Sequence, residues 1–357
     1  MKKGFIVGCL LFLVLNVLGA YSLDNTDISS IGSGSAGLAL ISAASSLANP
    51  AALYYRGIDN SSLYVSGSYN DTIVPSNFSN NEANPLLEAP ISNFCVSFSG
   101  SNLALTFETK SSLTDRIVDI DGTSYVANSS TLFQLDWAVG TSTLAFGLSL
   151  RAVSYSERSP VEIRSDHLLG DYFVETILGK YETLEDESTI SAGLGLLLNY
   201  DWFKMGVTSD SFAYSKGGNA LAISSESLFK TLDWGFALSS PVYDRTNQLN
   251  LFKFEAAMDL CNIGDADTRE VRFGADLKLQ LLPYWSVSLK TGYRETKPTL
   301  TDFFAVVPSN GVHTLGLSVL LNRFSLDLAC AIPLEWYIGT RNEDSSVAVT
   351  LAMSLSV

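Results

Sequence analysis

Apolar and polar residues alternate along most of the chain after residue 60. In one such segment Val271, Phe273 and Leu277 alternate with Arg272 and Asp276, and the last eleven residues repeat the pattern. A period of two is typical of β-strands, whose successive side chains point to opposite faces. Fourteen segments show it: 62–69, 91–99, 103–110, 131–139, 144–151, 189–199, 203–209, 231–238, 250–260, 271–280, 285–294, 312–321, 324–330 and 347–357.

The connections between these segments differ at the two ends. Those after even-numbered segments are mostly tight turns, although 239–249 is longer. Those after odd-numbered segments are mostly long and polar, namely 70–90, 111–130, 152–188, 210–230, 295–311 and 331–346, with 261–270 as the brief exception. Short turns at one end and long loops at the other are typical of outer-membrane barrels, and a strand of about 9–11 residues tilted by about 45° crosses a bilayer. The pattern predicts an all-β fold, a 14-stranded antiparallel transmembrane β-barrel over 58–357.

A secreted soluble β-sandwich or barrel would alternate in the same way. The bulky apolar face and the charges on the polar face favour the membrane barrel, and so do aromatic residues near segment ends. Tyr200, Trp202 and Trp285 lie on the turn side, while Tyr155 and Tyr293 lie on the loop side. Such residues form girdles at both membrane interfaces. Closure is required, because an open sheet edge cannot face lipid.

The first twenty residues have the pattern of a secretory signal peptide. Lys2 and Lys3 precede an uncharged apolar run over 4–17, and small residues follow at 18–22. The run is too short for a membrane helix. We therefore expect 1–20 to be cleaved, and the mature chain to lie in the outer membrane of a diderm bacterium with outer-membrane lipid around it.

Composition and spacing argue against several other classes. The formal net charge of −15 excludes a basic nucleic-acid-binding surface. Cys95, Cys261 and Cys330 are far apart and form no C-x-x-C pair, so neither a disulfide framework nor a zinc site is expected. His167 and His313 lack companions at ligand or triad spacing, and no G-x-S-x-G elbow occurs. We predict no enzyme, no cofactor and no metal.

The stretch GSGSAG at 32–37 matches the G-x-G-x-x-G pattern of dinucleotide-binding loops. That interpretation needs a preceding strand, a following helix and a parallel βαβ unit. Residues 21–31 leave too little chain for them, and the rest alternates as an antiparallel barrel does. We interpret 21–57 instead as a small plug in the barrel lumen, with a short helix over 36–48 that ends at Asn49-Pro50. A flexible export tail is the alternative.

The sequence IGSGSAGLALISAASSLANPAALYY resembles the N-terminal hatch of the FadL-type long-chain fatty-acid transporters. In that family a Gly- and Ala-rich stretch leads to Asn-Pro-Ala just before the first strand. Asn49, Pro50 and Ala51 match this triplet, and Gly32, Gly34 and Gly37 fit the stretch before it. The resemblance implies a fourteen-stranded outer-membrane channel for passive uptake of hydrophobic or amphipathic small molecules. It further implies long-chain fatty acids as the ligand and the hatch as the gate.

Two features depart from the family. Its members have a lateral opening at a kinked third strand, whereas segment 103–110 contains neither Gly nor Pro. The last residue is Val357 rather than an aromatic residue. The sequence therefore does not determine whether a lateral opening exists here.

Charged residues on the polar face are candidates for ligand contact. Arg151, Arg272 and Arg294 are placed near the long-loop end, where a guanidinium could bind a carboxylate head group in a bidentate manner. Lys253, Lys278 and Lys290 lie deeper. The alternative is that these cations pair with lumen acids, namely Asp136, Glu255, Asp259, Asp276 and Asp327.

Three other functions remain open at this point. A FadL-like barrel can serve as a docking partner in secretion, a general porin would lack a plug, and an adhesin or antigen would use the long loops. The sequence does not determine the oligomeric state.

Overall fold

The computed structural model describes residues 36–41, 45–56, 61–70, 93–117, 123–160, 181–200, 202–216, 222–240, 243–244, 251–282, 285–296, 311–334 and 348–356. The predicted signal peptide, Gly32 and Gly34 lie outside these residues. Among the described residues, no helix is both long and apolar enough to span a membrane.

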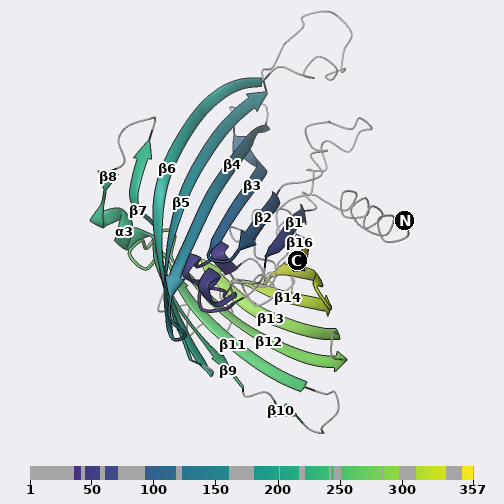
Figure 1. Cartoon of the computed structure of the whole chain (residues 1–357). Helices are drawn as coiled ribbons and strands as arrows, with labels where there is room; N and C mark the ends of the chain where they lie inside the picture. Colours follow the sequence, from purple (N-terminus) through teal and green to yellow (C-terminus); the bar gives the residue numbers. More distant parts are fainter. Residues whose placement is uncertain are drawn as a thin grey trace, which may run out of the picture.

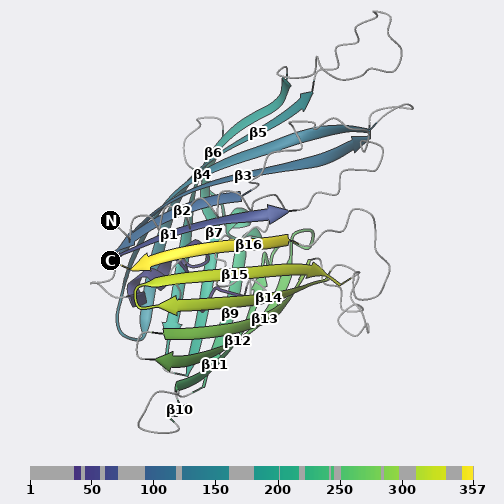
Figure 2. The same cartoon turned by 90° about the vertical axis from the view of Figure 1, so that its right-hand side faces the viewer.

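Fourteen antiparallel strands form a closed barrel (Figures 1 and 2). They are β1 (Ser62–Asn70), β2 (Asn93–Gly100), β3 (Leu103–Ile117), β4 (Thr123–Gly140), β5 (Leu144–Pro160), β6 (Tyr181–Asn199), β7 (Phe203–Lys216), β9 (Leu232–Ser239), β11 (Leu251–Cys261), β12 (Glu270–Leu282), β13 (Trp285–Thr296), β14 (Gly311–Leu321), β15 (Phe324–Pro333) and β16 (Ala348–Ser356). Strand β16 pairs with β1, and β9 pairs with both β7 and β11, which closes the ring. Two short strands, β8 (Ala222–Ile223) and β10 (Tyr243–Asp244), extend the ladders of β7 and β11. The predicted fold class is confirmed.

Each of the fourteen predicted segments corresponds to one barrel strand, but several strands are longer than predicted. Much of the expected loop 111–130 belongs to β3 and β4, and much of 152–188 belongs to β5 and β6. These extensions rise above the rest of the barrel (Figure 2). The prediction was wrong there because the alternation of apolar with polar residues fades, whereas antiparallel ladder pairing continues between polar residues.

The two faces of the wall carry different residues. In β4, Phe133, Leu135 and Trp137 are exposed on the outer face, whereas Asp136 and Ala138 are fully buried on the lumen face. The same alternation, exposed apolar outside and buried small or polar inside, runs through β5 and β6. The outer surface is therefore an apolar belt, as expected for strands in contact with lipid.

The described N-terminal residues lie inside the barrel (Figure 1). They form a turn at 38–39 and two 3-10 helices, η1 (Ser45–Leu47) and η2 (Pro50–Arg56). The single helix predicted over 36–48 is not formed in the described part of that segment, which contains only the short η1, and Pro50 begins a second helix instead of only ending the first. The carbonyl of Leu38, which would accept from residue 42 in an α-helix, instead accepts from the Asn49 side chain.

Candidate functional site

We call the described N-terminal residues 36–41 and 45–56 the hatch. Asn49 lies near its middle and is completely buried. Its Nδ2 donates to the carbonyl of Leu38 at 3.0 Å and to the carbonyl of Leu196 in β6 at 3.1 Å. Its Oδ1 accepts from the N–H of Ala51 at 3.0 Å. Both amide donors and the amide acceptor are thus used. The bond to the barrel wall joins residues 147 positions apart in the chain, so no local pattern predicts it.

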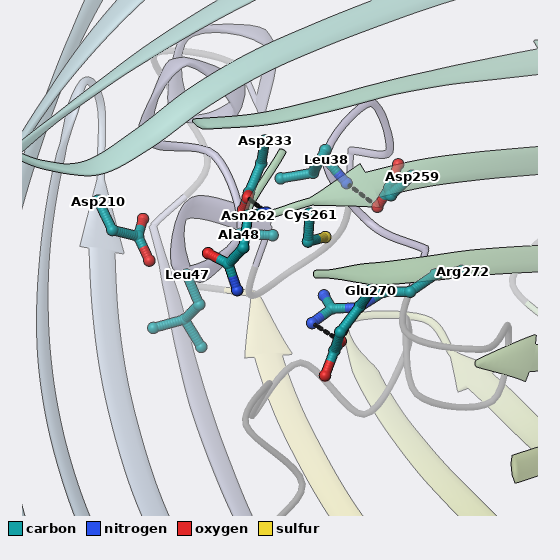
Figure 3. A pocket seen from close by; sticks show the side chains of 10 residues that line it. All are labelled: Leu38, Leu47, Ala48, Asp210, Asp233, Asp259, Cys261, Asn262, Glu270 and Arg272. Carbon is teal, nitrogen blue, oxygen red and sulfur yellow. Dashed lines mark hydrogen bonds and ion pairs between the residues drawn. The ribbon is translucent and has the colours of Figure 1, made fainter. Parts of the chain in front are cut away.

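Asp259 in β11 binds the other end of the hatch (Figure 3). Its Oδ2 accepts from the N–H of Gly37 at 2.6 Å and from the N–H of Leu38 at 3.0 Å. The side chain is only 1% exposed. Hydrogen bonds to a carboxylate are shorter and stronger than those between neutral groups. From the sequence, Asp259 was predicted only as a possible ion-pair partner, because no local pattern links residues 222 positions apart.

Four glycines on adjacent strands provide the surface on which the hatch lies. We call Gly147 of β5, Gly195 of β6, Gly206 of β7 and Gly235 of β9 the glycine wall. A Cβ atom at Gly147 would overlap the backbone of Pro50 and Ala51, and one at Gly195 would overlap the Asn49 side chain. At Gly206 it would overlap the Leu38 carbonyl, and at Gly235 the Asp259 carboxylate. Glycine is therefore required for close approach of hatch and wall.

Small apolar side chains fill the remaining contact between hatch and wall. Ala51 and Ala52 of the hatch are fully buried with Ala145, Leu197 and Ala237 of the wall. Leu53 packs in a second cluster with Ala104 and Ala138. The interface combines dense packing of small groups with the few directed hydrogen bonds of Asn49 and Asp259.

Two of the three predicted head-group arginines are paired with acids. Arg151 Nη1 lies 2.7 Å from Asp210 Oδ2, and Arg272 Nη2 lies 2.6 Å from Glu270 Oε2. Arg294 is directly opposite Arg272 in the pairing of β12 with β13, and no ion pair joins it to another described residue. Asp210 and Glu270 were not among the acids predicted as partners. Whether the arginines contact a ligand stays a prediction.

The predicted deeper lysines differ from one another. Lys253 Nζ lies 3.5 Å from Glu255 Oε2, and Lys290 Nζ lies 4.0 Å from Asp327 Oδ1, as the alternative interpretation expected. Lys278 is opposite Lys253 in the pairing of β11 with β12. A closer pair that was not predicted joins Lys204 to Glu255 at 2.7 Å. These charges lie on the lumen side of the barrel.

A cavity of about 220 Å³ lies between the hatch and the long-loop end of the wall (Figure 3). It is lined by Leu38, Leu47, Ala48, Asp210, Asp233, Asp259, Cys261, Asn262, Glu270 and Arg272. Four of these residues are acidic and one is basic. Asp233 Oδ1 accepts from the N–H of Asn262 at 2.6 Å, which ties the cavity wall to the turn between β11 and β12. The lining suits water or a polar group better than an apolar molecule.

Strand β3 is regular along its whole length. It pairs with β2 from Asn93↔Lys110 to Gly100↔Leu103 and with β4 from Leu103↔Trp137 to Ile117↔Thr123, without a shift of register. The absence of a kink agrees with the lack of Gly and Pro in segment 103–110.

No protein-family model matches this chain, and no curated protein sequence matches it. Solved structures do match over nearly their whole length. The Ralstonia pickettii toluene transporter TbuX is 15% identical with a TM-score of 0.52, and the match covers 96% of this chain and 99% of that one. The Pseudomonas putida toluene transporter TodX is 13% identical with a TM-score of 0.52, and the match covers 96% of this chain and 99% of that one. The monoaromatic hydrocarbon channel CymD is 13% identical with a TM-score of 0.51, and the match covers 94% of this chain and 98% of that one. These likenesses establish that this chain has the fold of those hydrocarbon transporters and channels.

Proposed function

We propose that this protein is a FadL-type outer-membrane channel for the passive uptake of hydrophobic or amphipathic small molecules, gated by the hatch. The observation that carries the proposal is the docked hatch. A segment held by Asn49 and Asp259 against the glycine wall lies within a barrel whose outer face is apolar. The shared fold with toluene transporters supports it.

Gating follows from the kind of contact that holds the hatch. A few hydrogen bonds fix the turn at 38–39 and the Asn49-Pro50-Ala51 triplet to the wall. A bond between neutral groups contributes about 0.5–1.5 kcal/mol net, and one to a charged carboxylate about 1.5–3 kcal/mol. Such contacts can be exchanged for others without unfolding the barrel. A shift of this segment would open a route along the lumen without any energy source other than the ligand gradient.

The ligand class has two candidates. The resemblance to the FadL family favours long-chain fatty acids, and the fold is shared with channels for monoaromatic hydrocarbons. Because Arg151 and Arg272 are already paired with acids, Arg294 is the arginine best placed to meet a carboxylate head group. A neutral hydrocarbon would need none of them.

The test uses the full-length chain refolded in lipid vesicles and a fluorescent long-chain fatty acid, with toluene as a competitor. Saturable binding to the natural chain is expected, together with altered transfer into the vesicles for Asn49→Ala/Pro50→Ala. Ser46→Ala is the matched control, because Ser46 is buried in the same hatch and its Oγ has no hydrogen-bond partner among the described residues. The control should behave as the natural chain does.

The outcomes separate the remaining functions. Displacement of the probe by toluene would identify a hydrocarbon ligand, and resistance to toluene would favour fatty acids. Absence of binding in a folded barrel would reject the proposal and favour a secretion-docking or adhesin role.

A further inference from the structure

The barrel wall is short at β9. This strand has eight residues, whereas β5 has 17 and β6 has 19. A strand tilted by about 45° needs about 9–11 residues to cross a bilayer. On this side of the barrel, β9 alone does not span the full height of the membrane.

The ladder between β7 and its neighbour is also interrupted at this height. Strand β7 pairs with β9 up to Ser209↔Leu232 and then with β8 from Ala213↔Ile223. On its other side the register with β6 shifts between Ala192 and Leu194, so that residues 210–212 form a bulge. The chain between β8 and β9 leaves the sheet here as the helix α3 (Ser225–Lys230).

Helix α3 is fixed to the outer face of the wall (Figure 1). Lys204, Gly206 and Thr208 of β7 face the lumen, so Ser209 faces outward. Ser209 Oγ lies 2.8 Å from Thr231 Oγ1 and donates to the carbonyl of Leu228 at 3.3 Å.

Two further bonds hold the helix at the rim. Ser227 Oγ donates to Ser211 Oγ of the bulge at 3.1 Å. The N–H of Gly264, in the turn between β11 and β12, donates to the carbonyl of Phe229 at 3.1 Å. The side chains and carbonyls of α3 thus bridge the strands where ladder bonds are missing.

Two large apolar side chains, one on β8 and one on α3, are exposed next to charged residues of the helix. Ile223 of β8 is 83% exposed and pairs with Ala213 of β7, and Phe229 of α3 is 60% exposed. Glu226 and Lys230 form an ion pair of 2.8 Å on the same helix. This surface continues the apolar belt of the barrel at the height where β9 ends.

We propose that α3 lies in the outer-leaflet interface of the membrane, with Phe229 and Ile223 in contact with lipid acyl chains. It completes the lipid-facing belt above the short strand β9. The apolar side chains enter the lipid while the Glu226–Lys230 pair stays at the head-group level, as in other interfacial helices. The inference rests on the membrane location contained in the proposed function and is independent of transport.

The test places an environment-sensitive fluorophore on single cysteines of the full-length chain, in a background with all four native cysteines, Cys9, Cys95, Cys261 and Cys330, changed to Ala. Cys95, Cys261 and Cys330 are free thiols. The probe sites are Phe229→Cys and Ile223→Cys. Leu148→Cys on the outer face of β5 is the lipid-exposed control, and Asp267→Cys in the exposed turn is the aqueous control. Vesicles contain phospholipids with a quencher on the acyl chain, and heat-dependent gel migration confirms folding.

Probes at 229 and 223 should emit at shorter wavelength than the probe at 267 and lose emission to the quencher as the probe at 148 does. If both behave like the probe at 267, the inference is wrong although the barrel is in the membrane. Emission at shorter wavelength that is not quenched by the lipid and that depends on protein concentration would mean that a second copy covers α3. This result would also overturn the inference. No quenching at 148 would reject the membrane location itself.

Discussion

The lumen surface of the barrel differs between two neighbouring regions built on the same strand pattern. The glycine wall has no side chains where the hatch approaches, and the hatch backbone takes that space. The adjacent region, which we call the charged wall, consists of Glu255, Asp276, Lys278, Lys290 and Asp327 on β11, β12, β13 and β15. Its side chains face one another across the strands, as in the row Glu255↔Asp276↔Lys290.

The difference shows that alternation assigns a face to each residue without assigning a role to that face. In both regions every second residue points into the lumen. Glycine there allows a second backbone to bind closely, whereas charged residues satisfy one another and keep the lumen polar. Asp259 belongs by position to the charged side, yet it binds the hatch. It is the residue at which the two regions meet.

The largest effect is expected from a substitution that places a large side chain in the glycine wall. In Gly147→Leu the new side chain would occupy the position of the Ala51 backbone, and overpacking of this kind costs about 1–3 kcal/mol or more. The hatch should leave the wall, which would raise ionic conductance in planar bilayers and expose the hatch to protease. Gly292→Leu on the lumen face of β13 is the control, and it should leave the protease resistance of the hatch unchanged. An equal response in both variants would contradict a specific role for the glycine wall.

A smaller effect is expected from the residue that joins the two regions. Asp259→Ala leaves the N–H groups of Gly37 and Leu38 without an acceptor, and each unpaired buried group costs about 1–3 kcal/mol. Asp259→Asn keeps one acceptor oxygen and should lie between the natural chain and Asp259→Ala. Hydrogen exchange at the Gly37 and Leu38 amides measures the loss.

The matched control for Asp259 is Asp327→Asn, which changes an acid of the charged wall paired with Lys290. It should leave exchange at the Gly37 and Leu38 amides slow. If Asp259→Ala exchanges no faster than this control, Asp259 does not hold the hatch.

The smallest effect is expected in the turn between β11 and β12, outside the barrel strands. Asp265 Oδ1 accepts from the N–H of Asp267 and Oδ2 accepts from the Thr268 hydroxyl, both at 3.0 Å. These hydrogen bonds to its ionised form lower the pKa of Asp265 below its ordinary value. The stabilisation is therefore complete above the unfolded pKa of about 3.9 and is lost as the pH falls through the lower folded pKa.

Protection of the Asp267 amide, measured as its exchange rate relative to the intrinsic rate at the same pH, should fall on acidification in the natural chain. In Asp265→Asn the protection should be lower at neutral pH and should show no acid-dependent step from this residue. A step that persists in the variant would assign the titration to another group.

Much of the fold could be predicted from local pattern. Segments such as 271–280 alternate strictly, and each predicted segment lies within one strand or overlaps most of it. The long-loop ends of β5 and β6 were not predicted, because the sequence there, for example near Ser188, is mostly polar and lacks the alternation of apolar with polar residues. The hatch helix was not predicted correctly, because the Leu38 carbonyl and its neighbouring N–H groups bind partners elsewhere in the chain.

The candidate site was predictable only in part. Asn49 and Pro50 were identified from a short motif, and the Asn49 contact with Ala51 spans two residues. The pairs Arg151–Asp210 and Arg272–Glu270 were not predicted, because Asp210 and Glu270 lie in the segments 210–230 and 261–270 that were predicted as connections, whereas the structure places them in β7 and β12.

The sequence by itself determined that this chain is a closed barrel of alternating strands with a segment of small residues ahead of it. The physical reason is that strand period and turn length are local properties, written in consecutive residues. Only the tertiary structure decided where that segment docks, which acid binds it, which arginine lacks an acidic partner among the described residues, and that α3 lies on the outer face. Those outcomes depend on strand register and on contacts between residues far apart in the chain, and a single sequence carries no local signal for either.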